Sequence, residues 1–406
     1  MICKYDDGCR IFSIRTKQYI LPIMTENKIT LIATSVFGLE AVVKREVESL
    51  GFQNIQVADG RIEFDACIAD IPKANLWLRC ADRVLLKVGE FEAKTFDELF
   101  DGTKSLPWAE WITKDGVFVV DGKAVRSTLG SVRACQAIVK KAVAENLKEN
   151  YKVEWLVETG AEFNIQISML KDVALLTIDT SGVGLHKRGY REDAGVAPLK
   201  ETLAAGLVFL SRWNGEQLLI DPMCGSGTIL IEAVMIARNI APGLRRNFVS
   251  EDWPNIEKRA WNKARREAKE AINKDLELTL WGYDIDNKNI KICRKNASNA
   301  GIYDDIKFEQ KDIKDLWIDR QYGTVIFNPP YGVRLSEFKE LNEIYISIHK
   351  TFKKKLGWSL FVLTSDEIFP NYFKRSRPDK IRKLYNGRIK VNYYQYRGVR
   401  ELRHQA

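Results

Sequence analysis

The sequence predicts an α/β protein in which smaller α/β modules precede a doubly wound parallel sheet. From Gln217 onward, segments with strand and helix periodicity alternate, a pattern typical of a parallel sheet with helices on both faces. Between residues 29 and 179 the strand-like and helix-like segments follow one another less regularly. The length of 406 residues suits two or three domains.

The first predicted module is a ferredoxin-like subdomain over residues 25–67. Apolar residues at helical spacing, with Gly51 at the expected end, predict its helix, and alternating segments predict its strands. The expected elements are a strand at 29–34, a helix at 38–50 and strands at 53–57 and 61–64. Residues 1–24 lack either periodicity and are left as an unassigned amino-terminal extension.

A second α/β module is expected over residues 68–181. Its expected elements are a strand at 117–121, a helix at 131–150 and strands at 163–170 and 173–179. Three basic residues, Lys123, Arg126 and Arg133, lie on or beside the helix. A turn signal at 181–184 is expected to begin the linker to the third domain.

The third domain is expected over residues 182–406. Strands are expected at 218–221, 278–284, 306–310, 324–328 and 359–364, and helices at 228–237, 287–300 and 337–355. Residues 250–274 read as one charged amphipathic helix inserted after the first of these helices. Asn386-Gly387 predicts a hairpin turn that adds antiparallel strands at the end of the sheet.

Composition excludes several classes of protein. No apolar run reaches the ~18 residues of a membrane span, and the charged amino terminus does not resemble a secretory signal, so a cytoplasmic protein is expected. Seven scattered cysteines and three histidines form no zinc-like spacing, so no metal site is expected. The net charge of +9 equals the excess within residues 371–406, where eleven Lys and Arg face two acidic residues. Such a basic segment favours a polyanionic partner.

A glycine-rich loop follows the first strand of the third domain, in Asp221-Pro-Met-Cys-Gly-Ser-Gly-Thr. Gly225 and Gly227 permit a tight turn and the close approach of a ligand. The loop lacks the Gly-Lys-Ser/Thr of a phosphate-binding loop, and Leu230 replaces the third glycine of a dinucleotide fingerprint. An adenosyl-amino acid remains, and its ribose and ammonium groups require acidic partners.

Acidic residues stand where such a ligand would need them, at the carboxyl ends of the predicted parallel strands. Asp221 ends the first strand, and Asp284, followed by Asp286, ends the second. A carboxylate at the second position is suited to accept both ribose hydroxyl hydrogen bonds. Asp312 follows the third strand and is placed to accept from an adenine amino group. The expected cofactor is S-adenosylmethionine.

The fourth strand of this domain ends in Asn328-Pro329-Pro330-Tyr331. The two prolines fix an extended backbone, so the Asn328 side chain and the Pro329 carbonyl present acceptors at a rigid spacing. Two acceptors that hold both hydrogens of an exocyclic amine direct the nitrogen lone pair toward a methyl donor. Tyr331 offers a ring face for the extracted base. The motif therefore predicts methylation of an amino group on a base.

Together, the glycine loop and the Asn-Pro-Pro-Tyr motif resemble those of THUMP-domain RNA methyltransferases, in particular the bacterial large-subunit ribosomal RNA guanine-N2 methyltransferases. The likeness includes the stretches at 185–191 and 197–205. It implies a ferredoxin-like subdomain, a THUMP domain that binds RNA and a Rossmann-like catalytic domain. The resemblance also suggests that His186, Arg188 and Tyr190 line the approach to the target. Lys123, Arg126 and Arg133 are close in sequence within the THUMP-like segment, so we expect them to form a basic patch that contacts RNA.

The resulting prediction is S-adenosylmethionine-dependent methylation of a guanine N2 amine in 23S rRNA. The same chemistry on transfer RNA is a close alternative. DNA adenine-N6 methylation shares the Asn-Pro-Pro-Tyr motif, and an RNA-binding protein without activity is a further alternative. Some members of the resembled family carry a second methyltransferase domain, which is not expected here.

Overall fold

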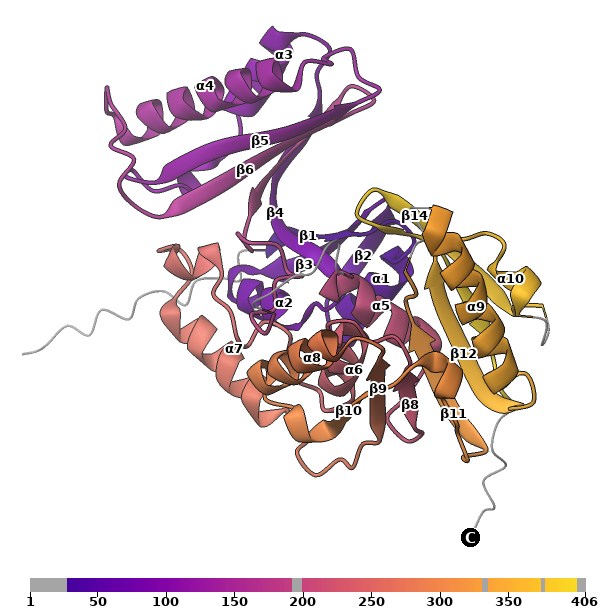
Figure 1. Ribbon diagram of the computed structural model, residues 1–406. Helices are drawn as coiled ribbons and strands as arrows, with labels where there is room; N and C mark the ends of the chain where they lie inside the picture. The colour runs from indigo at the N-terminus through magenta and orange to yellow at the C-terminus, as the bar shows by residue number, and fades with distance from the viewer. Residues whose placement is uncertain (1–27, 192–198, 331–334, 374–376, 400–406) are drawn as a thin grey trace, which may run out of the picture.

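The computed structural model describes residues 28–191, 199–330, 335–373 and 377–399, with the backbone alone over 335–340. Residues 1–24, left unassigned above, lie outside this range. The described strands form two seven-stranded sheets, and Figure 1 shows one module standing above the rest of the molecule. No helix among the described residues has the length and apolar character needed to cross a bilayer. The predicted α/β fold class is confirmed.

A ferredoxin-like unit forms the first part of the chain. Its elements are β1 (Lys28–Ser35), α1 (Glu40–Ser49), β2 (Gln53–Ala58), β3 (Arg61–Cys67), α2 (Ile71–Trp77) and β4 (Ala81–Glu92). The strands lie in the order β2-β3-β1-β4 and pair antiparallel. Helix α1 buries Val42, Val43 and Val47 against them, as its periodicity predicted.

Strand β4 carries the same sheet into the second module. Leu86 pairs with Leu31 of β1, whereas Glu92, at the other end of β4, pairs with Val173. The second module consists of α3 (Phe96–Lys104), β5 (Val117–Val125), α4 (Val132–Tyr151), β6 (Glu162–Leu170) and β7 (Val173–Asp179). Figure 1 shows α3 and α4 together on one face of these strands.

The carboxy-terminal domain holds the second sheet, in the order β10-β9-β8-β11-β12-β14-β13. Its parallel strands are β8 (Leu219–Asp221), β9 (Leu280–Asp284), β10 (Ile306–Gln310), β11 (Tyr322–Phe327) and β12 (Gly357–Thr364). The helices include α5 (Glu201–Ser211), α6 (Thr228–Ala237), α8 (Asn287–Ala300) and α9 (Leu335–Phe352). The strand order reverses between β8 and β11, and open α/β sheets bind ligands at the carboxyl ends of the strands at such a point.

The predicted single helix over 250–274 is wrong. The structure has a 3-10 turn at Val249–Asp252 and a separate helix, α7 (Lys258–Glu270), because Pro254 interrupts the helical hydrogen bonds between them. Trp253, in the interruption, stacks on Phe163 of β6 with ring centroids 5.0 Å apart. The insertion therefore packs the second module against the carboxy-terminal domain.

A hairpin of β13 (Lys380–Asn386) and β14 (Ile389–Tyr396) completes the second sheet. Asn386 pairs with Ile389, so the turn residues are Gly387 and Arg388, one position later than the predicted Asn386-Gly387. Gly387 takes the positive φ of 62° that the turn requires.

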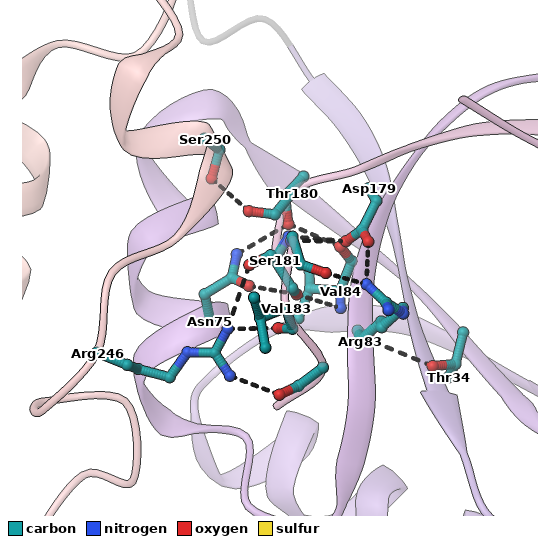
Figure 2. Close-up of polar contacts among 12 residues, drawn as sticks. Thr34, Asn75, Arg83, Val84, Asp179, Thr180, Ser181, Val183, Arg246 and Ser250 are labelled. Atoms are coloured by element: carbon teal, nitrogen blue, oxygen red, sulfur yellow. Dashed lines mark hydrogen bonds and ion pairs between the residues drawn. The ribbon is translucent and has the colours of Figure 1, made fainter. Parts of the chain in front are cut away.

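The modules meet at the residues that follow β7 (Figure 2). The Asn75 amide donates to the Thr180 hydroxyl at 2.8 Å, and Ser250 Oγ donates to the Thr180 carbonyl at 2.6 Å. The Arg246 guanidinium donates to backbone carbonyls of the linker, including that of Gly184 at 2.6 Å. These contacts tie α2, the linker and the inserted segment to one another.

Candidate active site

The carboxyl edge of the second sheet brings the predicted site residues together. Asp221 ends β8 and Asp284 ends the neighbouring β9, while Asn328 follows β11 on the other side of β8. Because these strands are parallel, all three residues lie at the same edge, at the point where the strand order reverses.

The two glycines of the loop serve different purposes. A Cβ at Gly225 would meet no protein atom within 4 Å, so this residue (φ 55°) faces open space that a ligand can occupy. A Cβ at Gly227 (φ 80°) would lie 3.3 Å from Cys293 Sγ and from the Phe308 ring. Gly225 therefore leaves room for a ligand, whereas Gly227 permits close packing at the start of α6.

The Asp284 carboxylate fixes the loop to the end of β9. Its Oδ2 accepts from the Gly225 N–H at 2.9 Å, and its Oδ1 accepts from the Asp286 N–H at 2.9 Å and from Asn289 Nδ2 at 3.0 Å. The Asp286 carboxylate instead caps α8 by accepting from the Lys288 N–H at 2.8 Å. Of the two acids, Asp284 faces the glycine loop. Its oxygens have further lone pairs that can accept from a ligand.

Asp221 is a buried carboxyl group with few partners. It is 1% exposed and accepts from the Met223 N–H at 3.1 Å. Burial raises the pKa of Asp221 to about 8; the Met223 N–H opposes this rise, and the nearby Asp284 adds to it. None of the ion pairs between described residues involves Asp221. A positively charged ligand group would stabilise its ionised form.

Asp312 lies two residues after the end of β10, the strand next to β9. Its Oδ1 accepts from the Lys314 N–H at 2.9 Å and so caps a 3-10 turn. The preceding residue, Lys311, donates its backbone N–H to the Asp284 carbonyl at 2.9 Å. Ile285, next to Asp284, is 66% exposed. The apolar side chain of Ile285 and the acids Asp284 and Asp312 thus border the same edge of the sheet, as the binding of a nucleoside would require.

Asn328 presents an acceptor that the described residues leave unused. Its Oδ1 is buried and has no hydrogen-bond partner among them. Pro329 is also buried and Pro330 is exposed, while Tyr331 lies outside the described residues. An unsatisfied buried acceptor costs about 1–3 kcal/mol, so each such group in a folded protein calls for an explanation, and a bound donor is one.

The suggestion that Arg188 and Tyr190 line the approach to the target is wrong. They are 2% and 1% exposed, and both contact Glu232 Oε1 on α6, at 3.5 Å and 3.1 Å. Arg188 also donates to the Arg79 carbonyl, so these side chains fill the interface between α6 and the ferredoxin-like unit. His186 is half-buried, and burial followed by the Lys200 charge lowers its pKa to about 4.

Sequence reasoning assigned no role to Arg191. Its guanidinium donates to the Thr228 hydroxyl and to the Leu199 carbonyl, and it lies 3.4 Å from Glu201. Thr228 is the first residue of α6, directly after the glycine loop. Arg191 thereby joins the linker to the loop. The only signal in the sequence was that Arg191 and Glu201 fall in the two further stretches that carried the family resemblance.

Family models match three parts of the chain. An RMKL-like methyltransferase domain matches residues 188–395, an RlmL ferredoxin-like domain matches residues 30–85, and a THUMP domain matches residues 93–179. These ranges follow the three structural units described above.

Among curated proteins, the chain is 50% identical over 371 residues to "Putative RNA methyltransferase YpsC" of Bacillus subtilis, covering 91% of this chain and 96% of that one. It is 34% identical over 369 residues to ribosomal RNA large subunit methyltransferase K/L of Psychromonas ingrahamii. That match covers 89% of this chain but 49% of the relative, so the chain spans about half the length of the K/L protein.

Solved structures superpose over most of the chain. One, described as a predicted N6-adenine-specific DNA methylase from Listeria monocytogenes, has 47% identity and a TM-score of 0.88, covering 92% of this chain and 97% of that one. Another, SMU.472, described as a putative methyltransferase complexed with S-adenosylhomocysteine (SAH), has 42% identity and a TM-score of 0.88. It covers 93% of this chain and 100% of its own.

Proposed function

Since the chain belongs to the RMKL-like methyltransferase family, with a THUMP domain and an RlmL-type ferredoxin-like domain before it, we propose that it methylates the N2 amine of a guanine in 23S rRNA. The predicted resemblance to THUMP-domain methyltransferases is confirmed. The cofactor is S-adenosylmethionine, whose demethylated product SAH accompanies the SMU.472 relative. Our proposal adds two points to the family and the cofactor, namely the position of the methylated amine and the class of RNA.

The residues of the loop edge fit this cofactor. Gly225 leaves open space and Asp221 offers a buried carboxyl group to a cationic group. We assign Asp284 to the ribose hydroxyls and Asp312 to the adenine amine, while Gly227 keeps α6 close to the loop. When bound, the cofactor supplies an electrophilic methyl group on a sulfonium.

The unused Asn328 acceptor is the observation that carries the proposal. We propose that Asn328 Oδ1 accepts a hydrogen bond from one hydrogen of the target amine and that the Pro329 carbonyl accepts from the other. Holding both hydrogens favours a pyramidal nitrogen, whose lone pair then points at the methyl donor. No base is needed before attack, because the proton can leave after transfer. Pro330 keeps the backbone extended, and Tyr331 is assigned to stack on the base.

RNA is favoured as substrate by the THUMP match and by the names of the two curated relatives, which refer to RNA or ribosomal RNA. Lys123, Arg126 and Arg133 are all exposed on the THUMP domain. Lys123 lies on the edge strand β5, Arg126 directly follows this strand, and Arg133 lies in the first turn of α4. We propose that they contact RNA phosphates. Methylation of a transfer RNA guanine uses the same groups and remains the closest alternative.

A second candidate is DNA adenine-N6 methylation, because the Listeria relative is described in those words. The test is to incubate the purified protein with labelled S-adenosylmethionine and 23S rRNA, transfer RNA or duplex DNA, then identify the modified nucleosides by mass spectrometry. We expect N2-methylguanosine from rRNA. N6-methyldeoxyadenosine as the dominant product would assign the second function instead.

A further inference from the structure

The tip of the β13–β14 hairpin extends past the sheet at the active-site edge. Thr364, the last residue of β12, pairs with Asn392, whereas β14 begins three residues earlier at Ile389. At about 3.3 Å per residue, the tip reaches roughly 10 Å beyond the end of β12. Because β12 is parallel to β11, this is the edge at which Asn328 lies.

The loop that follows β1 packs against this hairpin. Phe37 contacts Tyr385 of β13 edge to face, with ring centroids 6.0 Å apart and planes at 81°. A Cβ on Gly38 would lie 2.5 Å from the Lys383 carbonyl oxygen, so the two backbones are in direct contact. Phe37 is nevertheless 51% exposed, which leaves part of its ring open to solvent.

Lys200 and Asp82 border the same space as Phe37 and Tyr385. Lys200 immediately precedes α5, whose amino-terminal end lies at the active-site edge because Arg191 joins Leu199 to Thr228 of α6. The Thr202 hydroxyl donates to Asp82 Oδ1 at 3.0 Å and holds this carboxylate in place.

These elements enclose an open pocket of about 480 Å³, which we call the hairpin-tip pocket. It is lined by Val36, Phe37, Asp82, Lys200, Tyr385 and Gly387. Its volume falls within the range of about 300–1,000 Å³ that small-ligand sites occupy. Lys383 and Arg388 are exposed on the adjoining hairpin.

The lining groups have the chemistry of a nucleotide site. Phe37 and Tyr385 offer ring surface on which a base can stack. The Asp82 carboxylate accepts, so it suits the exocyclic amine of a base. Lys200, with Lys383 and Arg388 beside the pocket, suits the flanking phosphates.

We propose that the hairpin-tip pocket binds an unpaired RNA nucleotide that flanks the target nucleotide. This inference rests on the proposed function, since it assumes an RNA substrate. It gives the basic carboxy-terminal strands a part in holding RNA at the active site, in addition to the THUMP contacts proposed above.

The test uses the full-length protein and a fluorescein-labelled single-stranded 12-mer of cytidine, whose bases carry an exocyclic amine, with binding followed by anisotropy. Phe37→Ala and Tyr385→Ala should each weaken binding roughly 5- to 100-fold, the range for the loss of one stacked base, and Phe37→Trp should restore it. Lys200→Gln should reduce the slope of log affinity against log salt concentration by about 0.7. Calorimetric binding of S-adenosylmethionine should be unchanged in all four variants.

The matched control is Tyr303→Ala. Tyr303 is 49% exposed, a fraction similar to the 51% of Phe37. It precedes β10, however, so it lies at the opposite edge of the catalytic sheet. Its removal should leave RNA affinity unchanged. Equal losses for Phe37→Ala and Tyr303→Ala would overturn the proposal.

Two further outcomes separate this inference from the proposed function. Normal oligonucleotide binding by the Phe37 and Tyr385 variants, combined with reduced methylation of ribosomal particles, would assign the pocket to a protein partner and overturn the inference. If the wild-type protein methylates DNA but no RNA, the proposed function fails. If it methylates RNA while the pocket variants behave like wild type, the inference alone fails.

Discussion

The backbone N–H of Gly225 donates a 2.9 Å hydrogen bond to the side chain of Asp284, and this contact joins the glycine loop to the next strand of the sheet. The sequence assigned Asp284 to the ribose hydroxyls of the cofactor. In the structure the same carboxylate also accepts from Asp286 N–H and Asn289, so it shapes the loop before any ligand arrives.

Asp284→Ala should therefore impair both cofactor binding and stability. Removing each charged hydrogen bond should cost about 1.5–3 kcal/mol, so we expect calorimetry to show strongly reduced S-adenosylmethionine affinity together with a lower Tm. Asp286→Ala is the matched control, because the Asp286 carboxylate caps α8 and the substitution keeps the Asp286 N–H that donates to Asp284. It should cost about 1 kcal/mol of stability and keep cofactor affinity. The reverse pattern would move the ribose contact to Asp286.

Asp221 should make stability depend on pH. Its pKa is raised from 3.8 to about 8 in the folded protein, so the folded state holds a proton that the unfolded state has lost. This proton contributes its full stabilisation of the folded state below about pH 4. The contribution decreases as pH rises and is lost as pH passes through about 8. In melting experiments, Asp221→Asn should raise Tm more at pH 8.5 than at pH 6. An equal change at both values would contradict the raised pKa.

The buried pair of Arg188 and Glu232 should matter for folding. Their side chains are 2% and 0% exposed, so Glu232→Ala leaves a buried guanidinium without its counter-charge, at a cost of about 3–5 kcal/mol. In urea unfolding, Glu257→Ala should cost at most about 1 kcal/mol, because Glu257 pairs with Arg259 at the surface. Similar losses for the two variants would show that the interface with the ferredoxin-like unit contributes little.

Replacing Lys123, Arg126 and Arg133 together by Gln should weaken binding of a structured rRNA fragment. The salt slope should fall by roughly one unit for each phosphate that is no longer neutralised, with S-adenosylmethionine affinity unchanged. Replacing Lys350, Lys353 and Lys354 by Gln removes the same charge from the opposite edge of the catalytic sheet and should have a smaller effect. Equal effects would show that net charge, rather than the THUMP surface, governs RNA affinity.

The sequence predicted the elements around the cofactor site to within a few residues. Helices α6 and α8 and strand β10 begin and end where their patterns predicted, because a glycine loop and the terminal Gly301 mark them clearly. Strand β4 was missed because it passes from one half of a sheet to the other, with an irregular register between Lys87 and Gly89, so its apolar residues do not alternate.

Other features depend on contacts that no local pattern reveals. Helix α5 is buried on nearly every side, so it lacks the polar face by which amphipathic helices are recognised. Arg188 and Tyr190 look like surface residues in the sequence, and only the packing of α6 against the ferredoxin-like unit buries them. The hairpin-tip pocket joins residues 36, 82, 200 and 385, which are far apart in the chain.

Nucleoside mass spectrometry of 23S rRNA tests the central claim most directly. The rRNA is taken from cells that lack the gene and from the same cells complemented with the wild-type gene or with Asn328→Ala. We expect one N2-methylguanosine to disappear on deletion, to return with wild type and to stay absent with Asn328→Ala. The purified variant should keep its S-adenosylmethionine affinity and its Tm, because the substitution removes an unsatisfied buried acceptor. An unchanged N2-methylguanosine content after deletion, or full restoration by Asn328→Ala, would contradict the account.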